Sequence, residues 1–210
     1  MGKLTKKEIA ELIEAMRGLY PEAECALVHE DPFQLLVAVM LSAQTTDKSV
    51  NGVTPALFER WPDAAALAEA ELPELEAALR TIGMHRTKAK NLKALCRVVA
   101  SEYGGEVPAD YDKLVALPGV GRKTANVVLS VGFGQPRIAV DTHVFRLAGR
   151  MGLAAEKDVL KTELALMKAI PEKDWIMMHH ALIWHGRQVC HARKPQCESC
   201  GVRDWCRRNL

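Results

Sequence analysis

The 210-residue sequence has no hydrophobic run long enough to cross a membrane. Its longest apolar stretch, residues 33–41, is interrupted by Gln34, whereas a membrane-spanning helix needs about 20 apolar residues. The N-terminal segment has no secretory hydrophobic region, and Lys6 stands where a myristoylation pattern needs Ser or Thr. We therefore expect a cytoplasmic protein without membrane attachment, in which residues 33–41 form a buried helix.

Alternating strand patterns, internal repeats and low-complexity linkers are also nearly absent. Apolar residues instead recur at helical spacing, as in residues 9–16, and Thr5 and Glu8 form a capping-box pair before them. Residues typical of helix starts and ends punctuate the rest of the chain: Asp31, Asp63, Asp141 and Asp174 for starts, and Gly83, Gly104, Gly105 and Gly132 for ends. These patterns predict an all-α fold with compact domain boundaries.

The net charge of +2 is too small to indicate a nucleic-acid partner by itself, but the basic residues are grouped. Residues 80–97 contain six Lys or Arg and no Asp or Glu. A second basic group lies near the C-terminus and consists of Arg187, Arg193, Lys194, Arg203, Arg207 and Arg208. One such group is often only a solvated helix face; two of them favour a polyanionic partner.

Four of the six cysteines are concentrated near the C-terminus, namely Cys190, Cys197, Cys200 and Cys206. In a cytoplasmic protein, four thiolates that bind a metal centre are favoured over two disulfides. One C-x-x-C pair flanked by single cysteines favours an iron–sulfur cluster, but the spacing leaves zinc open. Either centre would hold a short basic segment in a rigid loop. Cys96 lies on an apolar helical stripe, where a buried free thiol is expected.

Residues 117–128, LPGVGRKTANVV, place two glycines directly before a basic and then apolar segment. The phosphate-loop pattern is not satisfied, because Arg122 separates Gly121 from Lys123. Residues 110–118 predict a short helix upstream, so the pattern indicates a helix, a glycine hairpin and a second helix. Backbone N–H groups at such a hairpin suit a nucleic-acid phosphate, although an ordinary helix–helix turn fits the same residues.

Four separated motifs occur in an order that resembles the endonuclease III family of helix-hairpin-helix DNA glycosylases. They are SAQTTD at 42–47, the glycine hairpin at 117–128, AVDTH at 139–143, and the four-cysteine tail. The resemblance implies two all-α domains. Residues 25–135 would form a six-helix barrel domain with the helix-hairpin-helix motif at about 111–131, and residues 1–24 and 136–210 a domain whose cysteines bind a 4Fe–4S cluster.

The family's chemistry requires an amine, because an amine forms a Schiff base with a sugar aldehyde carbon. The resemblance implies that Lys123 attacks C1′ of the damaged nucleotide, expels the base and forms an imine that permits β-elimination of the 3′ phosphate. It also implies that Asp141 stabilises positive charge on the sugar, although an Asp before Thr142 equally fits a helix N-cap. The expected activity is that of a bifunctional DNA glycosylase and AP lyase of base excision repair that removes oxidised pyrimidines.

A base inside a duplex must be flipped out and its place filled. The resemblance assigns the filling to Gln44 and to Met84, where the family commonly has leucine, and Thr45 replaces a frequent alanine. An apolar, flexible methionine can serve as a wedge. Further expected DNA contacts are His85, Gly119, Gly121, Arg122, Arg193 and Lys194, and Asp47 and His143 are expected to line the base pocket. The expected partner is double-stranded DNA containing damaged pyrimidines or abasic sites, bound by a monomer.

Two other functions fit parts of the sequence. The adenine glycosylase of mismatch repair shares the cysteine spacing but lacks a lysine at the position of Lys123. A non-catalytic iron–sulfur module would bind DNA through the hairpin and the basic groups alone. Lys123 speaks against the adenine glycosylase, and the presence of both Lys123 and Asp141 speaks against the non-catalytic module.

Overall fold

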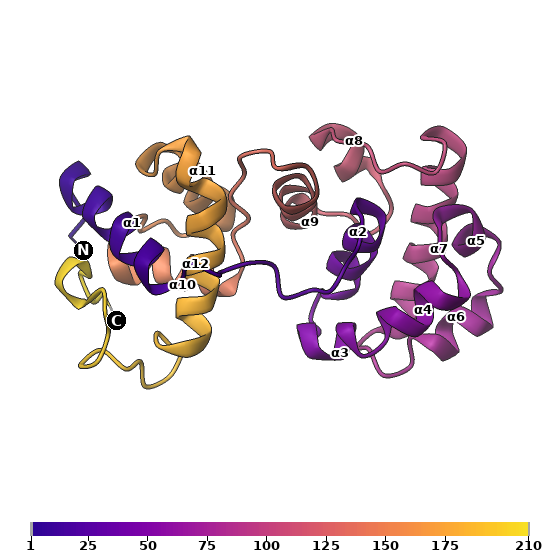
Figure 1. Ribbon diagram of the computed structural model, residues 1–210, viewed down its shortest axis with the longest axis horizontal. Coiled ribbons are helices and arrows are strands. Elements are labelled where there is room, and N and C mark those ends of the chain that lie inside the picture. The colour runs from indigo at the N-terminus through magenta and orange to yellow at the C-terminus, as the bar shows by residue number, and fades with distance from the viewer. Residues whose placement is uncertain (1, 210) are drawn as a thin grey trace. The chain divides into compact units, whose positions relative to one another are not determined.

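The computed structural model describes residues 2–209, which form helices, turns and irregular segments without any β-strand (Figure 1). The all-α prediction is therefore confirmed. The chain divides into two compact units. One, here called the contiguous unit, is Ala26–Gly134; the other, here called the split unit, joins Met1–Cys25 to Gln135–Leu210.

The contiguous unit is built around an apolar helix, α2. Its helices are α2 (Pro32–Leu41), α3 (Asp47–Asn51), α4 (Thr54–Arg60), α5 (Ala64–Glu69), α6 (Leu72–Ala78), α7 (His85–Glu102), α8 (Tyr111–Ala116) and α9 (Arg122–Val127), and α9 continues into a π-helical turn, Val128–Gly132. The Asp31 side chain caps α2 by accepting a 2.8 Å hydrogen bond from the Gln34 backbone N–H. Every residue of α2 from Phe33 onward except Gln34 is buried, as the sequence predicted, against α7, α9 and the π-helical turn.

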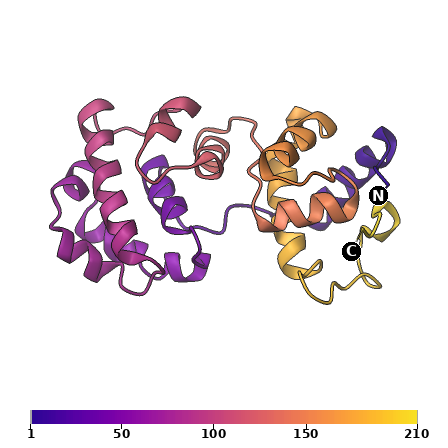
Figure 2. The same ribbon diagram turned by 180° about the vertical axis from the view of Figure 1, so that it is seen from behind.

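Helix α7 is the longest helix of the contiguous unit and lies along α5 and α6 (Figures 1 and 2). Its buried face includes Leu92, Leu95, Cys96 and Val99. Cys96 is fully buried and forms no disulfide, as predicted, and burial raises the pKa of its thiol to about 12. Gly83 does not end a helix, because α6 already ends at Ala78; it lies in the turn that precedes α7.

The split unit packs an N-terminal helix against helices from the other end of the chain. Its helices are α1 (Lys6–Leu19), α10 (Thr142–Met151), α11 (Val159–Ala169) and α12 (Trp175–Gln188), with 3-10 turns at Glu172–Asp174 and Arg203–Trp205. The predicted capping box starts α1: the Thr5 N–H donates to Glu8 Oε2 at 2.7 Å, and the Glu8 N–H donates to Thr5 Oγ1 at 3.3 Å. Helices α1 and α10 both pack against α12 around a common apolar core.

Residues 189–209, here called the cysteine tail, follow α12 and have little core of their own. Val202 is the one buried residue of the tail in the described chain. Polar contacts attach the tail to α1 and α10 instead. Trp205 Nε1 donates to Glu11 Oε2 at 3.0 Å, and the Arg207 N–H donates to the Met151 carbonyl at 3.2 Å.

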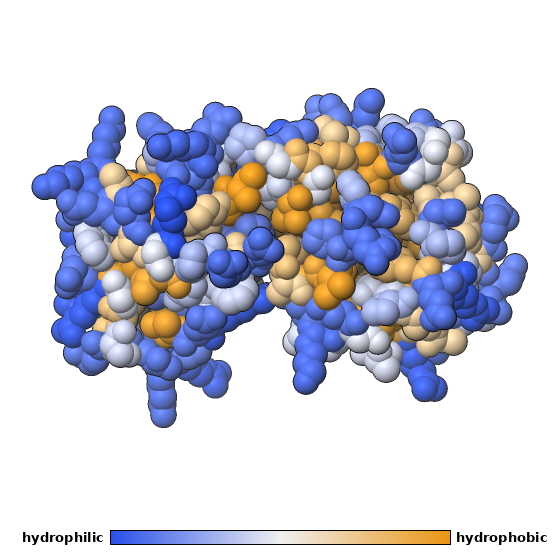
Figure 3. Space-filling model, viewed as in Figure 1, coloured by the Kyte–Doolittle hydropathy of each residue, from blue (hydrophilic) through white to orange (hydrophobic). Residues whose placement is uncertain are grey.

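Hydrophilic side chains project over much of the face shown in Figure 3, and hydrophobic residues are visible there in separate groups. Within residues 2–209 no helix combines the length and the apolar character that crossing a membrane would require.

Candidate functional site

The glycine hairpin joins α8 to α9, and its two glycines serve different purposes. Gly119 has a left-handed backbone with φ +78°, and a Cβ added there would lie 3.0 Å from Asn91 Cβ, so both conformation and space require glycine. Gly121 has φ −99° and open space around the position of a Cβ. It precedes α9 without supplying a side-chain cap.

The two cations after the hairpin are held differently. Arg122 Nη1 donates to the Tyr111 hydroxyl at 3.0 Å, and its guanidinium lies 5.5 Å from the Tyr111 ring centroid. Lys123 is exposed in the first turn of α9, and within residues 2–209 its amine makes no hydrogen bond or ion pair. The Lys123 amine is therefore not engaged by any other group of the described chain.

Asp141 is both a helix cap and a partly exposed carboxylate. Its Oδ1 accepts a 2.7 Å hydrogen bond from the Val144 N–H at the start of α10, so the N-cap interpretation is confirmed. Oδ2 has no hydrogen-bond partner in the described part of the chain. Capping thus uses one carboxylate oxygen and leaves the other for a second role.

His143 is the second residue of α10 and lies beside Arg146. Arg146 Nη2 lies 3.1 Å from His143 Nδ1. Burial lowers the pKa of His143, and the charges of Arg146 and Arg187 lower it further, while the Asp141 carboxylate and a hydrogen bond to the Gly186 backbone oppose this shift. The ring is therefore favoured in its neutral form.

Arg146 also joins α10 to α12 and to the start of the cysteine tail. Its Nη2 donates to the carbonyls of Gly186 and Cys190, each at 3.0 Å. A Cβ at Gly186 would lie 2.9 Å from His143 Nδ1, so this close helix contact requires glycine. The side chains beside Asp141 are thus connected to the backbone of the first cysteine.

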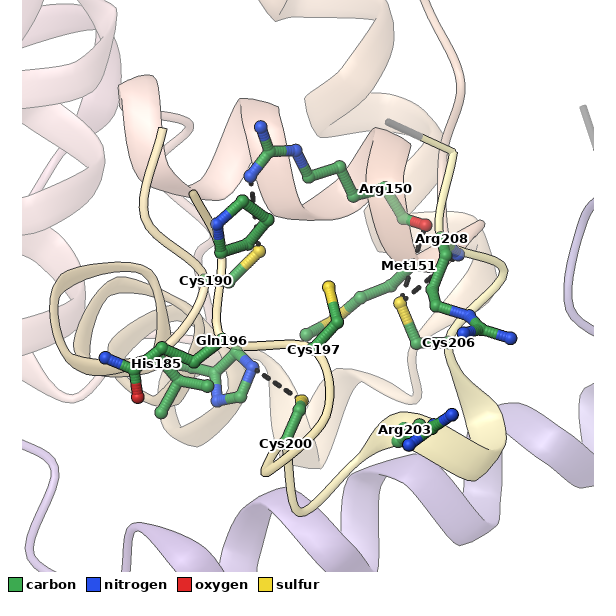
Figure 4. Close-up of a pocket in the computed structure, with 12 residues that line it drawn as sticks. Arg150, Met151, His185, Cys190, Gln196, Cys197, Cys200, Arg203, Cys206 and Arg208 are labelled. Carbon is green, nitrogen blue, oxygen red and sulfur yellow. Dashed lines mark hydrogen bonds between the residues drawn. The ribbon is translucent and has the colours of Figure 1, made fainter. Parts of the chain in front are cut away.

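The four tail cysteines line one cavity, together with residues from α10 and α12 (Figure 4). All four are free thiols. His185 Nε2 lies 3.5 Å from Cys200 Sγ, and Arg150 Nη1 lies 3.5 Å from Cys190 Sγ. The other ring nitrogen of His185, Nδ1, lies 2.7 Å from the Tyr20 hydroxyl.

The arrangement of the four sulfurs fits a cluster better than a single ion. Zinc needs its thiolates at about 2.3 Å from one point, and in residues 2–209 no group of three or more His, Cys, Asp or Glu side chains is close enough to hold one ion. Sulfurs spread around a cavity match the donor set of a polynuclear iron–sulfur centre.

Gln44 and Met84, from two separate turns of the contiguous unit, share an uncommon conformation. Both are exposed, and both have left-handed backbones, with φ +52° and +58°. Such φ values are uncommon for residues other than glycine and concentrate at functional sites. Asp47 lies nearby in sequence as the first residue of α3, and His85 is the first residue of α7.

Only part of each basic group of the sequence forms an exposed, unpaired surface patch. From residues 80–97, Lys88 is buried and Lys93 donates to the Ala70 carbonyl at 2.6 Å. In the tail, Arg203 and Arg207 form ion pairs with Glu198 and Glu8. Arg193 and Lys194 remain exposed and make no hydrogen bond or ion pair with any residue the structure describes.

Three residues beside these sites were not predicted from the sequence: Lys88, Arg150 and His185. Lys88 was one member of a basic group, and His185 belongs to no motif of the sequence. Arg150 carried no signal at all, because its contacts are with a segment about 40 residues away.

Comparisons with known proteins agree with this geometry. The family model of the HhH-GPD superfamily of base excision DNA repair proteins matches residues 37–172. The model of the iron-sulfur binding domain of endonuclease III matches residues 190–206, which span all four tail cysteines. This second match decides the open question of the metal centre: the chain carries a 4Fe–4S iron–sulfur cluster and not zinc.

Relatives match over nearly the whole chain. Endonuclease III of Bacillus subtilis (strain 168) is 48% identical, over 97% of this chain and 94% of that protein. Endonuclease III of Escherichia coli (strain K12) is 44% identical, over 97% of this chain and 96% of that protein. A solved structure of a trapped endonuclease III–DNA covalent intermediate is 49% identical with a TM-score of 0.93, covering 98% of this chain and 97% of that one. The chain belongs to the endonuclease III family of the HhH-GPD superfamily.

Proposed function

We propose that this chain removes oxidised pyrimidines from double-stranded DNA as a monomer in the cytoplasm. It is a bifunctional DNA glycosylase and AP lyase of base excision repair. The observation that carries the proposed mechanism is the exposed Lys123 amine, which follows the glycine hairpin and is bound to no other described residue.

Lys123 is the proposed nucleophile. Its Nζ forms a bond to C1′ as the bond between C1′ and the damaged base breaks, and the base leaves with a proton. The nitrogen then loses a proton to O4′ as the C1′–O4′ bond breaks, which opens the sugar ring and leaves an imine at C1′. Loss of a C2′ proton from this imine breaks the C3′–O bond to the 3′ phosphate. The family resemblance of the chain to enzymes that form a covalent DNA intermediate supports this assignment.

Asp141 is the proposed partner of this chemistry from the split unit. One oxygen caps α10, so the carboxylate is held in a fixed orientation. Its second oxygen would stabilise positive charge that develops on the sugar and assist proton transfer. His143 and Asp47 would line the pocket for the extruded base.

The proposed DNA contacts come from both units. Gln44 and Met84 would fill the space of the extruded nucleotide, with His85 beside Met84. The remaining proposed contacts are to phosphates, by the backbone of Gly119 and Gly121 and the side chains of Arg122, Arg193 and Lys194. The contiguous unit would correspond to the six-helix barrel domain, and the split unit to the cluster domain.

The four cysteines Cys190, Cys197, Cys200 and Cys206 are the proposed ligands of the 4Fe–4S cluster. When bound, the cluster supplies bonds that tie together four points of a segment with almost no apolar core. The left-handed backbone of Lys194, with φ +53°, then keeps this residue and Arg193 in an exposed turn.

Borohydride trapping tests the mechanism on a duplex with a single thymine glycol. The native protein should form a covalent adduct and cleave the strand, and Lys123→Gln should do neither. Lys113→Gln removes an exposed amine from the preceding helix and should leave trapping intact. Asp141→Asn should retain folding and the N-cap but release the base much more slowly.

The outcomes separate the three candidate functions. Base release without trapping or cleavage by the native protein would indicate a monofunctional glycosylase. Binding to DNA without release or cleavage, on thymine glycol and on a plain abasic site, would indicate a non-catalytic binding module. Trapping that persists in Lys123→Gln would reject Lys123 as the nucleophile.

A further inference from the structure

Lys88 is a buried cation that the proposed mechanism does not use. It lies one turn into α7, and its residue is only 4% exposed. Its amine donates to Thr45 Oγ1 at 2.7 Å, its one side-chain hydrogen bond in the described structure. Burial lowers the pKa of the Lys88 amine, because removing an ammonium from water is costly. Because burying an ammonium is costly, a lysine at this position suggests a role that an apolar side chain would not fill.

The Lys88–Thr45 hydrogen bond joins the two turns that carry Gln44 and Met84. Thr45 directly follows Gln44, and the Lys88 backbone N–H donates to the Met84 carbonyl at 3.0 Å. The turns also approach each other directly: a Cβ on Gly83 would lie 3.5 Å from the Gln44 carbonyl oxygen and 3.7 Å from Thr45 Oγ1. The bond therefore spans 43 residues of sequence at the place where the two turns meet.

Both turns need a constraint of this kind. Gln44 and Met84 are exposed residues in left-handed conformations, which persist only when surrounding contacts enforce them. An exposed turn without such contacts would be ordered only when it meets DNA, and ordering at that moment weakens binding. A single hydrogen bond between the two turns lowers this ordering cost for both Gln44 and Met84.

We propose that Lys88 and Thr45 are positioning residues that hold Gln44 and Met84 as one preorganised wedge for opening the duplex. This inference rests on the proposed function of Gln44 and Met84. The hydroxyl of Thr45 is the acceptor in this pair, and the amine of Lys88 is the donor. The pair acts on duplex opening and not on the bond-making steps at Lys123.

Two substrates separate these steps. Excision of thymine glycol from a duplex requires the nucleotide to be flipped out, whereas borohydride trapping on a single-stranded abasic oligonucleotide requires no duplex to be opened. Both reactions need Lys123. A lower ratio of the single-turnover duplex excision rate to the single-strand trapping rate therefore reports a defect in duplex opening or base release, and not in imine formation at Lys123.

Lys88→Met and Thr45→Val each remove one partner while keeping a similar side-chain size. We expect each to lower duplex excision by about 10-fold, the effect of losing a hydrogen bond to a charged group, and to leave single-strand trapping unchanged. Because the two residues act through one bond, the double variant should be no slower than the slower single variant.

Two controls match the variants. Lys93→Met removes another lysine of α7 whose amine bonds a backbone carbonyl away from these turns, and Thr45→Ser keeps the hydroxyl. Both should retain the native ratio of the two rates. Thermal unfolding of every variant shows whether a change in rate reflects a loss of fold.

The results distinguish the inference from the function it rests on. Unchanged duplex excision in Lys88→Met and Thr45→Val would overturn the inference, as would an equal loss on both substrates or strictly additive effects in the double variant. A native protein that cannot be trapped even on single-stranded abasic DNA would overturn the proposed function, and the inference with it.

Discussion

The helical hairpin of residues 110–132 and the cysteine tail are both proposed to contact DNA, but different forces hold them. The hairpin buries apolar side chains along both of its arms: Leu114, Leu117, Val120, Ala125, Val127, Val128 and Leu129. The tail is of similar length and buries only Val202 among the residues described. The apolar core beneath the hairpin can fix the backbone that presents N–H groups, whereas the cysteine tail depends on cluster–sulfur bonds and polar contacts.

Arginines carry much of the tail's attachment. Arg150 Nη1 donates to the His191 carbonyl at 2.7 Å, and its Nη2 donates to the Ala192 carbonyl at 2.9 Å. Arg207 Nη2 binds both carboxylate oxygens of Glu8, at 2.7 and 2.6 Å. These contacts orient the two ends of the tail, and Cys197, Cys200 and Cys206 lie between the anchored residues. A segment without a core can therefore be rigid if its ends are anchored and its middle is crosslinked.

Removing the iron should have the largest effect on local order, and this effect should be confined to the cysteine tail. Chelation of the holoprotein, or the substitution Cys197→Ser, deletes crosslinks that no apolar packing replaces. Amide hydrogen exchange in residues 190–206 should approach the rate of unstructured chain, while exchange in residues 110–132 stays at its native rate. Equal loosening of both segments would show that the hairpin also depends on the cluster.

The hairpin should respond to the loss of a buried side chain. Leu114→Ala removes a fully buried leucine of α8 and should destabilise the contiguous unit by about 2–5 kcal/mol. Denaturant unfolding measures this loss. The visible absorbance of the cluster is the internal control, because it should be unchanged under native conditions; bleaching of the cluster in this variant would contradict the separation of the two regions.

The smallest effect is expected at the ion pair between Arg207 and Glu8. The Thr5 backbone N–H and the Arg207 guanidinium lower the pKa of Glu8 from 4.5 to about 2. Because the folded-state pKa is lowered, this anchoring is fully present above pH 4.5 and is lost as the pH falls toward about 2. Both side chains are partly exposed to solvent, which screens the ion pair, so the effect on overall stability is small.

The Arg207→Met variant tests this anchor. Exchange of the amides in residues 203–209 should be faster than in the native protein at pH 6. The difference should shrink as the pH falls through about 2, the pKa of Glu8 in the native protein, because protonation removes the charge that Arg207 binds. A difference between the two proteins that does not depend on pH would assign the anchoring to the aliphatic part of Arg207 and not to its charge.

Local patterns in the sequence predicted much of the fold. Helical spacing of apolar residues and aspartates before helices placed α1, α2 and α10, because capping and amphipathic burial are interactions between residues a few positions apart. Asp174 also precedes a helix, α12, as predicted. Its side chain does not cap that helix, however, and accepts a 2.7 Å hydrogen bond from Arg17 Nη2 instead.

Tertiary contacts determine which charged side chains are exposed, buried or paired. Neighbouring residues do not distinguish Lys88, Lys93 and Arg207 from any surface cation. In the structure, however, Lys88 is buried, and Lys93 and Arg207 donate hydrogen bonds to oxygens of residues distant in sequence. Nothing within a few residues of Lys88 indicates that Thr45, 43 positions earlier, will accept its hydrogen bond.

The sequence by itself determined the helical class, the glycine hairpin before Lys123 and the four cysteines of the tail, because these features depend on residue type and short spacing. Only the tertiary structure decided which side chains remain available for chemistry and binding. It left the Lys123 amine exposed, assigned one oxygen of Asp141 to a helix cap, and turned part of each basic group inward. The physical reason is that burial and hydrogen bonding are settled by residues distant in sequence, and the final position of a charge depends on the partners that folding brings to it.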